Sequence, residues 1–329
     1  MTKPTLLLNP GMGWAATTPF HFTLTLQNKY AHHGKWKENW YLKRLSEYPK
    51  YEDHFYTIND PATQRKTNRP FDTEWGEYLS GRNKYAGKYE ENPLKFLFDR
   101  PPSIENYISY YLGQWEAVKG EYAAVCDFTN GNAELSYQFL SEIAPKLKEK
   151  FDVKVTFQFR DPVRRYFSEV GSLFSKKFEF SVDHKEDAMT KLLLRKKNAH
   201  KKLFFHLLRQ GRCSSLCDFA ETWYKYSSIF GKENTYVIIM EDFWDKNKEK
   251  EQLNALSNFL SYKITKLHEN CYVPDMGSRA PHLPFLQDQW ESDLEDLTEN
   301  DYQAALVYMS RYYTDFYNMF SFLPESWKK

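Results

Sequence analysis

The chain has 329 residues, of which 41% are hydrophobic and 27% are charged. These proportions exclude a disordered or fibrous protein, and the length is enough for one large α/β domain with a sizeable core. Lys and Arg number 45 against 44 Asp and Glu, so the formal net charge is only +1. Proteins that coat nucleic acid or an anionic membrane usually carry a larger positive excess. We therefore expect no nucleic-acid partner and no stable membrane association, and any anion site must be local.

The cysteines and the N-terminal segment indicate where the protein works. Cys213 and Cys217 lie close together, but neither Cys126 nor Cys271 completes a zinc-binding set, so we expect no metal site. Four scattered cysteines in a chain of this length are typical of a reducing compartment. The apolar run Leu6–Leu8 is far too short for a signal peptide, and no stretch approaches a membrane span. We expect a cytoplasmic protein.

Short apolar runs that end in Gly, Pro or charged residues predict buried strands. These runs lie at residues 5–9, 122–128, 153–159 and 236–240. Helices are predicted at residues 17–30, 104–115, 133–150, from 163, within 185–230, at 248–260 and at 299–320. Residues 20–30 also alternate like a strand, but Thr17-Thr18-Pro19 favours a helix start.

Strands that alternate with helices predict an α/β fold, with a P-loop-like central parallel sheet and helices on both faces. We expect a single domain over residues 1–329. It would carry an insertion rich in loops and short helices at about 45–115 and a C-terminal helical segment from about 285.

The first candidate site is the loop between the first predicted strand and the first predicted helix. Ligands of parallel sheets bind at the carboxyl ends of the strands, and a Gly-containing loop before a helix offers backbone N–H groups to an anion. The loop lacks the GK[ST] of a Walker A motif, which disfavours ATP hydrolysis. A plain βα turn is the alternative. The candidate anion-binding residues are Gly11, Met12, Gly13, Trp14, Ala15, Ala16, Thr17 and Thr18.

The second candidate site is the segment FRDPVRRYFSEV, residues 159–170. Arg160 ends a predicted strand, Ser168 follows on the next helix, and Arg165 precedes Ser168 by three residues on the same helical face. A guanidinium at a strand end and a hydroxyl on the adjoining helix can converge on one phosphate. The alternative is a surface arginine followed by an Asp-Pro helix start.

Together these segments resemble the sulfotransferase family, whose members use 3′-phosphoadenosine 5′-phosphosulfate (PAPS). The loop at 13–18 resembles the family's P-K-S-G-T-T loop for the 5′-phosphosulfate, and residues 160–168 resemble its R-N-P-V-x-R-x-x-S element for the 3′-phosphate. Residues 236–243 resemble a late strand that ends in E-D-L, and Asp127-Phe128-Thr129 resembles a D-F-T motif that some members carry near the middle of their sequence. Residues 37–42, KENWYL, resemble the K-E-x-x-[YF]-[FL] segment of the glycan-modifying, heparan-sulfate-type branch.

The resemblance implies a transferase with PAPS as cosubstrate and the bisphosphate PAP as product. Trp14 stands where the family has its loop lysine, and Ala16 stands where it has glycine. Lys35, Lys37 and the more distant Arg279, in a late loop where the family often covers the cofactor, are the candidates to supply the missing charge.

Sulfuryl transfer also needs a base that takes the proton of the acceptor. The resemblance nominates Glu38, whereas His32, His33 and Asp127 are further candidates. The alternative interpretation of each of these side chains is a solvated or structural group without a catalytic role. The acceptor is expected to be a small molecule or a glycan that presents a hydroxyl or an amine. The alternative functions are a nucleotide or sugar kinase with a degenerate phosphate loop, and a non-catalytic protein that binds a nucleotide or a glycan.

Overall fold

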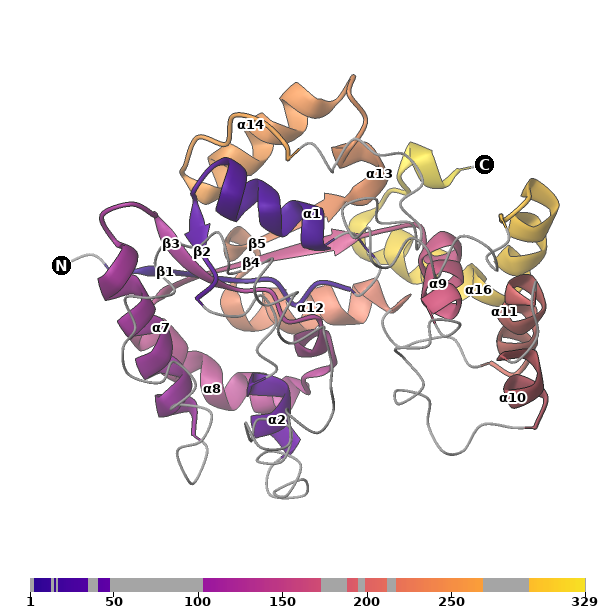
Figure 1. Ribbon diagram of the computed structural model, residues 1–329, viewed down its shortest axis with the longest axis horizontal. Helices are drawn as coiled ribbons and strands as arrows, with labels where there is room; N and C mark the ends of the chain where they lie inside the picture. The colour runs from indigo at the N-terminus through magenta and orange to yellow at the C-terminus, as the bar shows by residue number, and fades with distance from the viewer. Residues whose placement is uncertain are drawn as a thin grey trace.

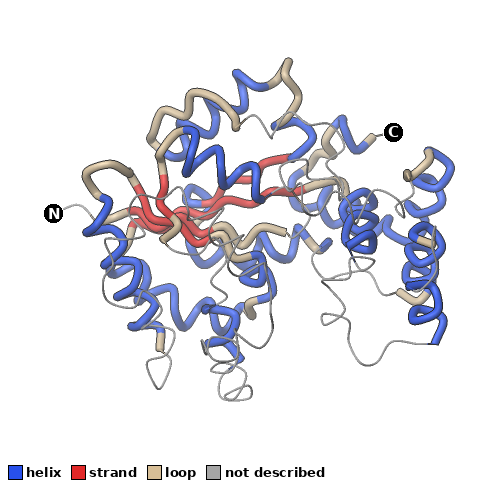
Figure 2. Tube along the Cα trace, viewed as in Figure 1, coloured by secondary structure: helices blue, strands red, loops and turns tan. Residues whose placement is uncertain are grey.

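The computed structural model describes residues 3–12, 15, 17–34, 41–47, 103–172, 188–194, 199–211, 217–268 and 296–328. Within them, five strands form one all-parallel sheet in the order β2-β3-β1-β4-β5. In Figure 2 the strands, in red, lie between layers of helices, in blue. The strands are β1 (Thr5–Leu8), β2 (Ala31–His32), β3 (Ala124–Asp127), β4 (Asp152–Phe159) and β5 (Thr235–Ile239). The predicted α/β fold with a central parallel sheet is confirmed.

Helices cover both faces of this sheet, with α1 and α14 on one side and α7, α8 and α12 on the other (Figure 1). The helices that cover the sheet or lie beside it include α1 (Thr17–Phe22), α7 (Ile104–Val118), α8 (Tyr137–Lys150), α9 (Pro162–Ser172), α11 (His200–Arg209), α12 (Phe219–Phe230), α14 (Glu249–Leu260) and α16 (Glu299–Phe320). Three further helices are α2 (Tyr41–Glu47), α10 (Ala188–Leu194) and α13 (Met240–Phe243). No helix in the described ranges is both long and apolar enough to cross a membrane.

The two-residue period of the strands divides the core into two layers. In β1, Leu6 and Leu8 join the cluster formed with α7, α8, α12 and α16, whereas Leu7 joins the cluster formed with α1 and α14. A strand buried on both faces is apolar throughout, which explains why the predicted apolar runs became sheet strands.

The interior strand β4 departs from this pattern. Its residues Val153, Val155, Phe157 and Phe159 face the first cluster. The alternate positions carry Lys154, Thr156 and Gln158, so one face of an interior strand is polar over most of its length.

The predicted helix after the first strand is confirmed, and it changes type along its length. Helix α1 continues directly into a π-helix, Thr23–Gln27. The hydroxyls of Thr23 and Thr25 donate to the carbonyls of Pro19 and His21, four residues earlier. The threonine side chains of the segment that alternates like a strand therefore form hydrogen bonds with the preceding turn of a helix.

The four predicted strands are confirmed, with ends that differ by at most two residues. The predicted start of the helix at Ala133 is wrong. Residues Asn130–Glu134 form a 3₁₀ turn, and α8 begins at Tyr137 because Ser136 caps it by accepting from the N–H of Phe139. Strand β2 was missed because two residues, one of them a histidine, are too short for a periodic signal.

Candidate anion-binding site

The topology puts the two predicted sites side by side. The connection from β1 runs to β2 on one side of β1, whereas the connections to and from β4 run toward the other side. Ligands of such sheets bind at the carboxyl ends of the strands where the direction reverses. Here this point lies between β1 and β4, and the loop at 9–16 and Arg160 follow these two strands.

Asn9 fixes the start of the loop. Its backbone N–H donates to the carbonyl of Asp127 on β3, 2.8 Å away. Its side-chain Nδ2 donates to the carbonyl and the hydroxyl oxygen of Thr156 on β4, at 3.0 and 2.8 Å. The chain therefore leaves β1 in a position set by both neighbouring strands.

The loop residue Gly11 lies where side chains from three elements meet. A Cβ at this position would lie 2.5 Å from Asn9 Oδ1 and 3.0 Å from Gln158 Oε1, and it would contact Thr17 Cγ2. Because a real Cβ does not approach other atoms so closely, only glycine fits at position 11 without displacing these groups.

The other predicted loop residues fall into two groups. Met12 and Ala15 are fully buried, and the N–H of Ala15 donates to the carbonyl of Met12 at 3.1 Å. Thr17 is buried at the start of α1, and Thr18 follows it in the helix. The positions Gly13, Trp14 and Ala16 lie outside the described residues, and so do the predicted residues Lys35, Lys37, Glu38 and Arg279.

Arg160 and Ser168 come together as the spacing predicts. Arg160 follows β4, Ser168 lies on α9, and Arg160 Nη1 donates to Ser168 Oγ at 3.0 Å. Both side chains are buried. A hydroxyl that accepts one hydrogen bond still carries its own O–H donor, so both groups can donate to a single phosphate.

Glu241 holds the turn that carries Arg160. Its carboxylate accepts from the backbone N–H of Asp161 and from Nε1–H of Trp327, both at 3.0 Å. Burial raises the pKa of Glu241, while the hydrogen bond from Trp327 and the positive charge of Arg160 oppose the shift. Glu241 belongs to the Glu-Asp pair after the last strand, where the sequence indicated only a weak motif.

The carboxylate of Asp161 stabilises the start of α9. It accepts from the N–H of Arg164 at 2.9 Å, as an N-terminal capping group does before Pro162. It also accepts from the hydroxyls of Tyr302 and Tyr313 on α16, at 2.6 and 2.8 Å. Burial raises the pKa of Asp161, and the hydrogen bonds oppose the shift.

Arg165, predicted to share the phosphate site, is 0% exposed and points to other partners. Its Nη1 contacts Glu169 Oε2 at 2.9 Å and Cys217 Sγ at 3.1 Å. These contacts tie α9 to the segment before α12, which favours a structural role for this guanidinium.

Asp127, one of the candidate bases, is the centre of a buried hydrogen-bond network. Oδ1 accepts from the N–H and the hydroxyl of Thr129, and Oδ2 accepts from the hydroxyl of Tyr107 and the amide of Asn132. Burial raises the pKa of Asp127, and these donors oppose the shift. With 0% exposure and four donors on its oxygens, this carboxylate holds the backbone after β3 and offers no open face to an acceptor.

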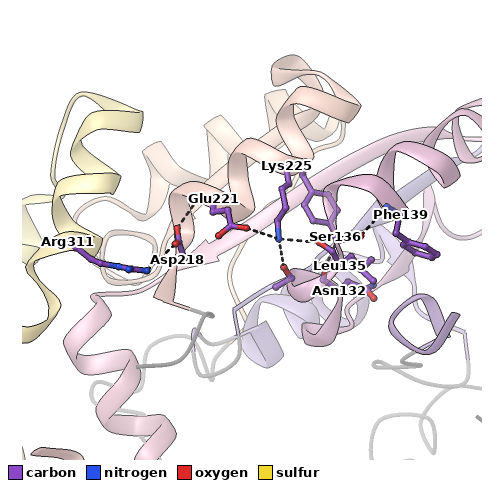
Figure 3. Close-up of polar contacts among 10 residues, drawn as sticks. Asn132, Leu135, Ser136, Phe139, Asp218, Glu221, Lys225 and Arg311 are labelled. Carbon is purple, nitrogen blue, oxygen red and sulfur yellow. Dashed lines mark hydrogen bonds and ion pairs between the residues drawn. The ribbon is translucent and has the colours of Figure 1, made fainter. Parts of the chain in front are cut away.

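Helix α12 supports the segment after β3 at residues 132–135 (Figure 3). Lys225 Nζ donates to the carbonyls of Ala133 and Leu135, each at 3.2 Å, and the hydroxyl of Tyr226 donates to the carbonyl of Asn132 at 2.7 Å. The network around Asp127 is therefore supported from a helix about ninety residues further along the sequence.

His33 lies at the carboxyl end of β2, two strands from β1, among buried aromatic rings. Its ring centroid is 4.7 Å from that of His21 on α1, and 5.8 Å from that of His32, onto which it stacks. His21 is four residues after Thr17, so one turn of helix separates the loop from this histidine cluster.

Two residues of the KENWYL segment reach the core. Tyr41 and Leu42 begin α2, both are buried, and the hydroxyl of Tyr41 donates to the carbonyl of Ser103 at 3.0 Å. This places the end of the segment firmly against α7.

Asn9 and Gln158 are residues of this region that the sequence analysis did not single out. For Gln158, the available signal was a polar side chain at the alternate positions of VKVTFQF, residues 153–159, in a strand that an α/β fold buries on both faces.

Neither a protein-family model nor a curated protein matches the chain. Among solved structures, a sulfotransferase from Alicyclobacillus acidocaldarius is similar, with a TM-score of 0.50 and 14% sequence identity, over 100% of both chains. At this identity the likeness concerns the fold. Over its whole length the chain shares an α/β fold with a bacterial sulfotransferase.

Proposed function

We propose that the protein is a sulfotransferase that uses PAPS and sulfates a hydroxyl or an amine of an acceptor. The observation that carries this proposal is the Arg160–Ser168 pair at the end of β4, adjacent to the loop after β1. Neighbouring parallel strands lie about 4.8 Å apart, so the Arg160–Ser168 pair and the loop after β1 are both available to bind the two ends of one nucleotide bisphosphate. The shared fold with a sulfotransferase supports the same activity.

The donors of the site fit the proposed cosubstrate. Arg160 and Ser168 would bind the 3′-phosphate through charge-assisted hydrogen bonds, and Glu241 and Asp161 keep Arg160 in place. The loop from Gly11 to Thr18 would bind the 5′-phosphosulfate at the start of α1. PAPS supplies the sulfuryl group, which passes in line to the acceptor oxygen or nitrogen.

The remaining chemistry falls to residues near the acceptor. In this proposal Glu38 takes the acceptor proton, and Lys35 or Lys37 stabilises the charge on the departing phosphate. His33 is the second candidate for the base, since it is one helical turn from the loop through His21. The resemblance of residues 37–42, KENWYL, to a segment of glycan-modifying sulfotransferases supports a carbohydrate as one acceptor class.

Calorimetry with PAP and with 5′-AMP tests the proposal. We expect PAP to bind more tightly, because the contact of a phosphate with Arg160 contributes about 1.5–3 kcal/mol. Arg160→Ala should remove most of this preference. Arg311→Ala, which deletes the same charge from an exposed position on α16, should preserve it. Equal affinities of the unmodified protein for PAP and 5′-AMP would overturn the assignment.

A further inference from the structure

Gln158 carries a buried side-chain amide on β4. It is 2% exposed, and neither Oε1 nor Nε2 has a hydrogen-bond partner among the described residues. Buried carboxamides in native proteins are nearly always hydrogen-bonded, because an unpaired donor or acceptor lost its contacts with water on folding. A leucine or valine at this position of an interior parallel strand would avoid that loss.

The neighbouring polar residue on the same face of β4 behaves differently. Thr156 accepts from Asn9 Nδ2 through both its hydroxyl and its carbonyl oxygen. The end of β1 is therefore already held to β4 without any contribution from Gln158. The unpaired amide has no structural task in this contact.

The position of Gln158 favours a role in ligand binding. Its Oε1 would lie 3.0 Å from a Cβ at Gly11, and Asn9 Oδ1, which also lacks a described partner, would lie 2.5 Å from the same point. The carboxamide thus lies under the loop residue Gly11, beside Thr17, at the carboxyl ends of β1 and β4. An unpaired buried amide faces the point where the sheet reverses direction and where α/β folds bind their ligands.

We propose that Gln158 is an anion-binding residue whose Nε2–H donates to the 5′-terminal phosphate of the bound nucleotide. This inference deepens the proposed function and rests on it. The amide adds a neutral donor from β4, in a protein where Trp14 stands in place of the family's loop lysine. Rotation of the carboxamide about its last torsion exchanges its nitrogen and oxygen, so the donor can face a phosphate oxygen.

The test measures the affinities of three probes by calorimetry: PAP, 5′-AMP and 3′-AMP. In Gln158→Leu, we expect the affinities for PAP and 5′-AMP to fall about tenfold or more, since one hydrogen bond to a charged group is lost. The affinity for 3′-AMP should be unchanged, because that probe has no phosphate at the 5′ end. Arg160→Ala should give the opposite pattern, with losses for PAP and 3′-AMP and none for 5′-AMP.

A second pair of variants separates a local contact from a general charge effect. Gln158→Glu places a carboxylate beside the phosphate and should weaken PAP and 5′-AMP more than Gln158→Leu does. Lys154→Gln lowers the net charge by the same amount on the same face of β4, but four residues nearer the amino end, beside Phe259. This control should bind all three probes as the unmodified protein does.

The stability of the free protein distinguishes a ligand-binding amide from a structural one. We expect Gln158→Leu to raise Tm without ligand, because it removes an unpaired buried polar group. A lower Tm would show that the amide is a structural group of the free protein and would overturn the inference.

The binding data separate this inference from the proposed function. If Gln158→Leu binds all three probes normally while PAP is preferred over 5′-AMP, the inference is overturned and the proposed function stands. If PAP is not preferred but 5′-AMP is weakened by Gln158→Leu, the 5′-phosphate contact stands and the sulfotransferase assignment falls. If the unmodified protein binds none of the probes, both are overturned.

Discussion

Tyr313 donates a hydrogen bond to the carboxylate of Asp161 at 2.8 Å, across 152 residues of sequence. Tyr302 donates to the same oxygen, and Trp327 supports Glu241 on the other side of the turn. The C-terminal residues of the protein therefore buttress the segment that carries Arg160. This arrangement connects the stability of α16 with the proposed 3′-phosphate site.

Removal of one of these tyrosine hydroxyls should lower the free energy of unfolding. Tyr313→Phe leaves the ring in the core but deletes a hydrogen bond to a buried carboxylate, so we expect a loss of about 1.5–3 kcal/mol in the free energy of unfolding. Tyr308→Phe, on the exposed face of the same helix, should change it by less than about 0.5 kcal/mol. Urea denaturation measures both. A Tyr313→Phe protein as stable as the Tyr308→Phe control would contradict the role of this contact.

Asp127→Asn tests the buried network after β3. All four groups that contact Asp127 are hydrogen-bond donors, two on each carboxylate oxygen. In the asparagine variant, an NH₂ group replaces one oxygen, and the two donors on that side then face another donor. We expect a loss of about 2 kcal/mol or more in the free energy of unfolding. A variant that unfolds normally but no longer transfers sulfate would instead support Asp127 as the base.

The pH dependence of this loss has a definite sign. Burial raises the pKa of Asp127 above its ordinary value of 3.8, so above that pH the folded protein binds more protons than the unfolded polypeptide. The associated stability is present below the ordinary pKa and is lost as pH rises through the folded-state pKa. The difference in stability between the unmodified protein and Asp127→Asn should therefore shrink from about pH 4 upward. A difference that grows over this range would show that the hydrogen bonds outweigh burial.

Lys225 should stabilise the fold more through its hydrogen bonds to two carbonyls than through its ion pair with Glu221. Lys225→Met removes the donors to Ala133 and Leu135 and should cost about 1–2 kcal/mol in denaturation experiments. Glu221 is 3.8 Å from the same ammonium group and is mostly exposed, so Glu221→Gln should cost less than about 0.5 kcal/mol. Equal losses in the two variants would assign the effect to the ion pair.

Glu38→Gln tests the proposed base. A positioned general base is typically worth about 10²–10⁴-fold in rate, so sulfate transfer from PAPS should fall by that order while the affinity for PAP is unchanged. The assay uses a panel of glycans and alcohols as acceptors. The matched variant is His33→Gln, in which we expect most of the turnover to remain. The reverse result would move the role of the base to His33.

The sequence by itself determined the features that depend on local spacing. Apolar runs of strand length predicted four of the strands, because a parallel sheet covered on both faces requires them. The eight-residue separation of Arg160 and Ser168 predicted that the two side chains can converge, and in the structure they lie within hydrogen-bond distance.

Only the tertiary structure decided the roles that depend on burial and on distant partners. Asp127 and Arg165 have the residue types of a functional site, but partners from other parts of the sequence, Tyr107 on α7 and Cys217 before α12, occupy them. Gln158 was an unremarked polar residue in a strand, and it became a candidate ligand group because β1 and β4 are neighbours. Hydrogen bonds between residues 152 positions apart leave no periodic trace in the sequence, because only the packed sheet and its helices bring such groups together.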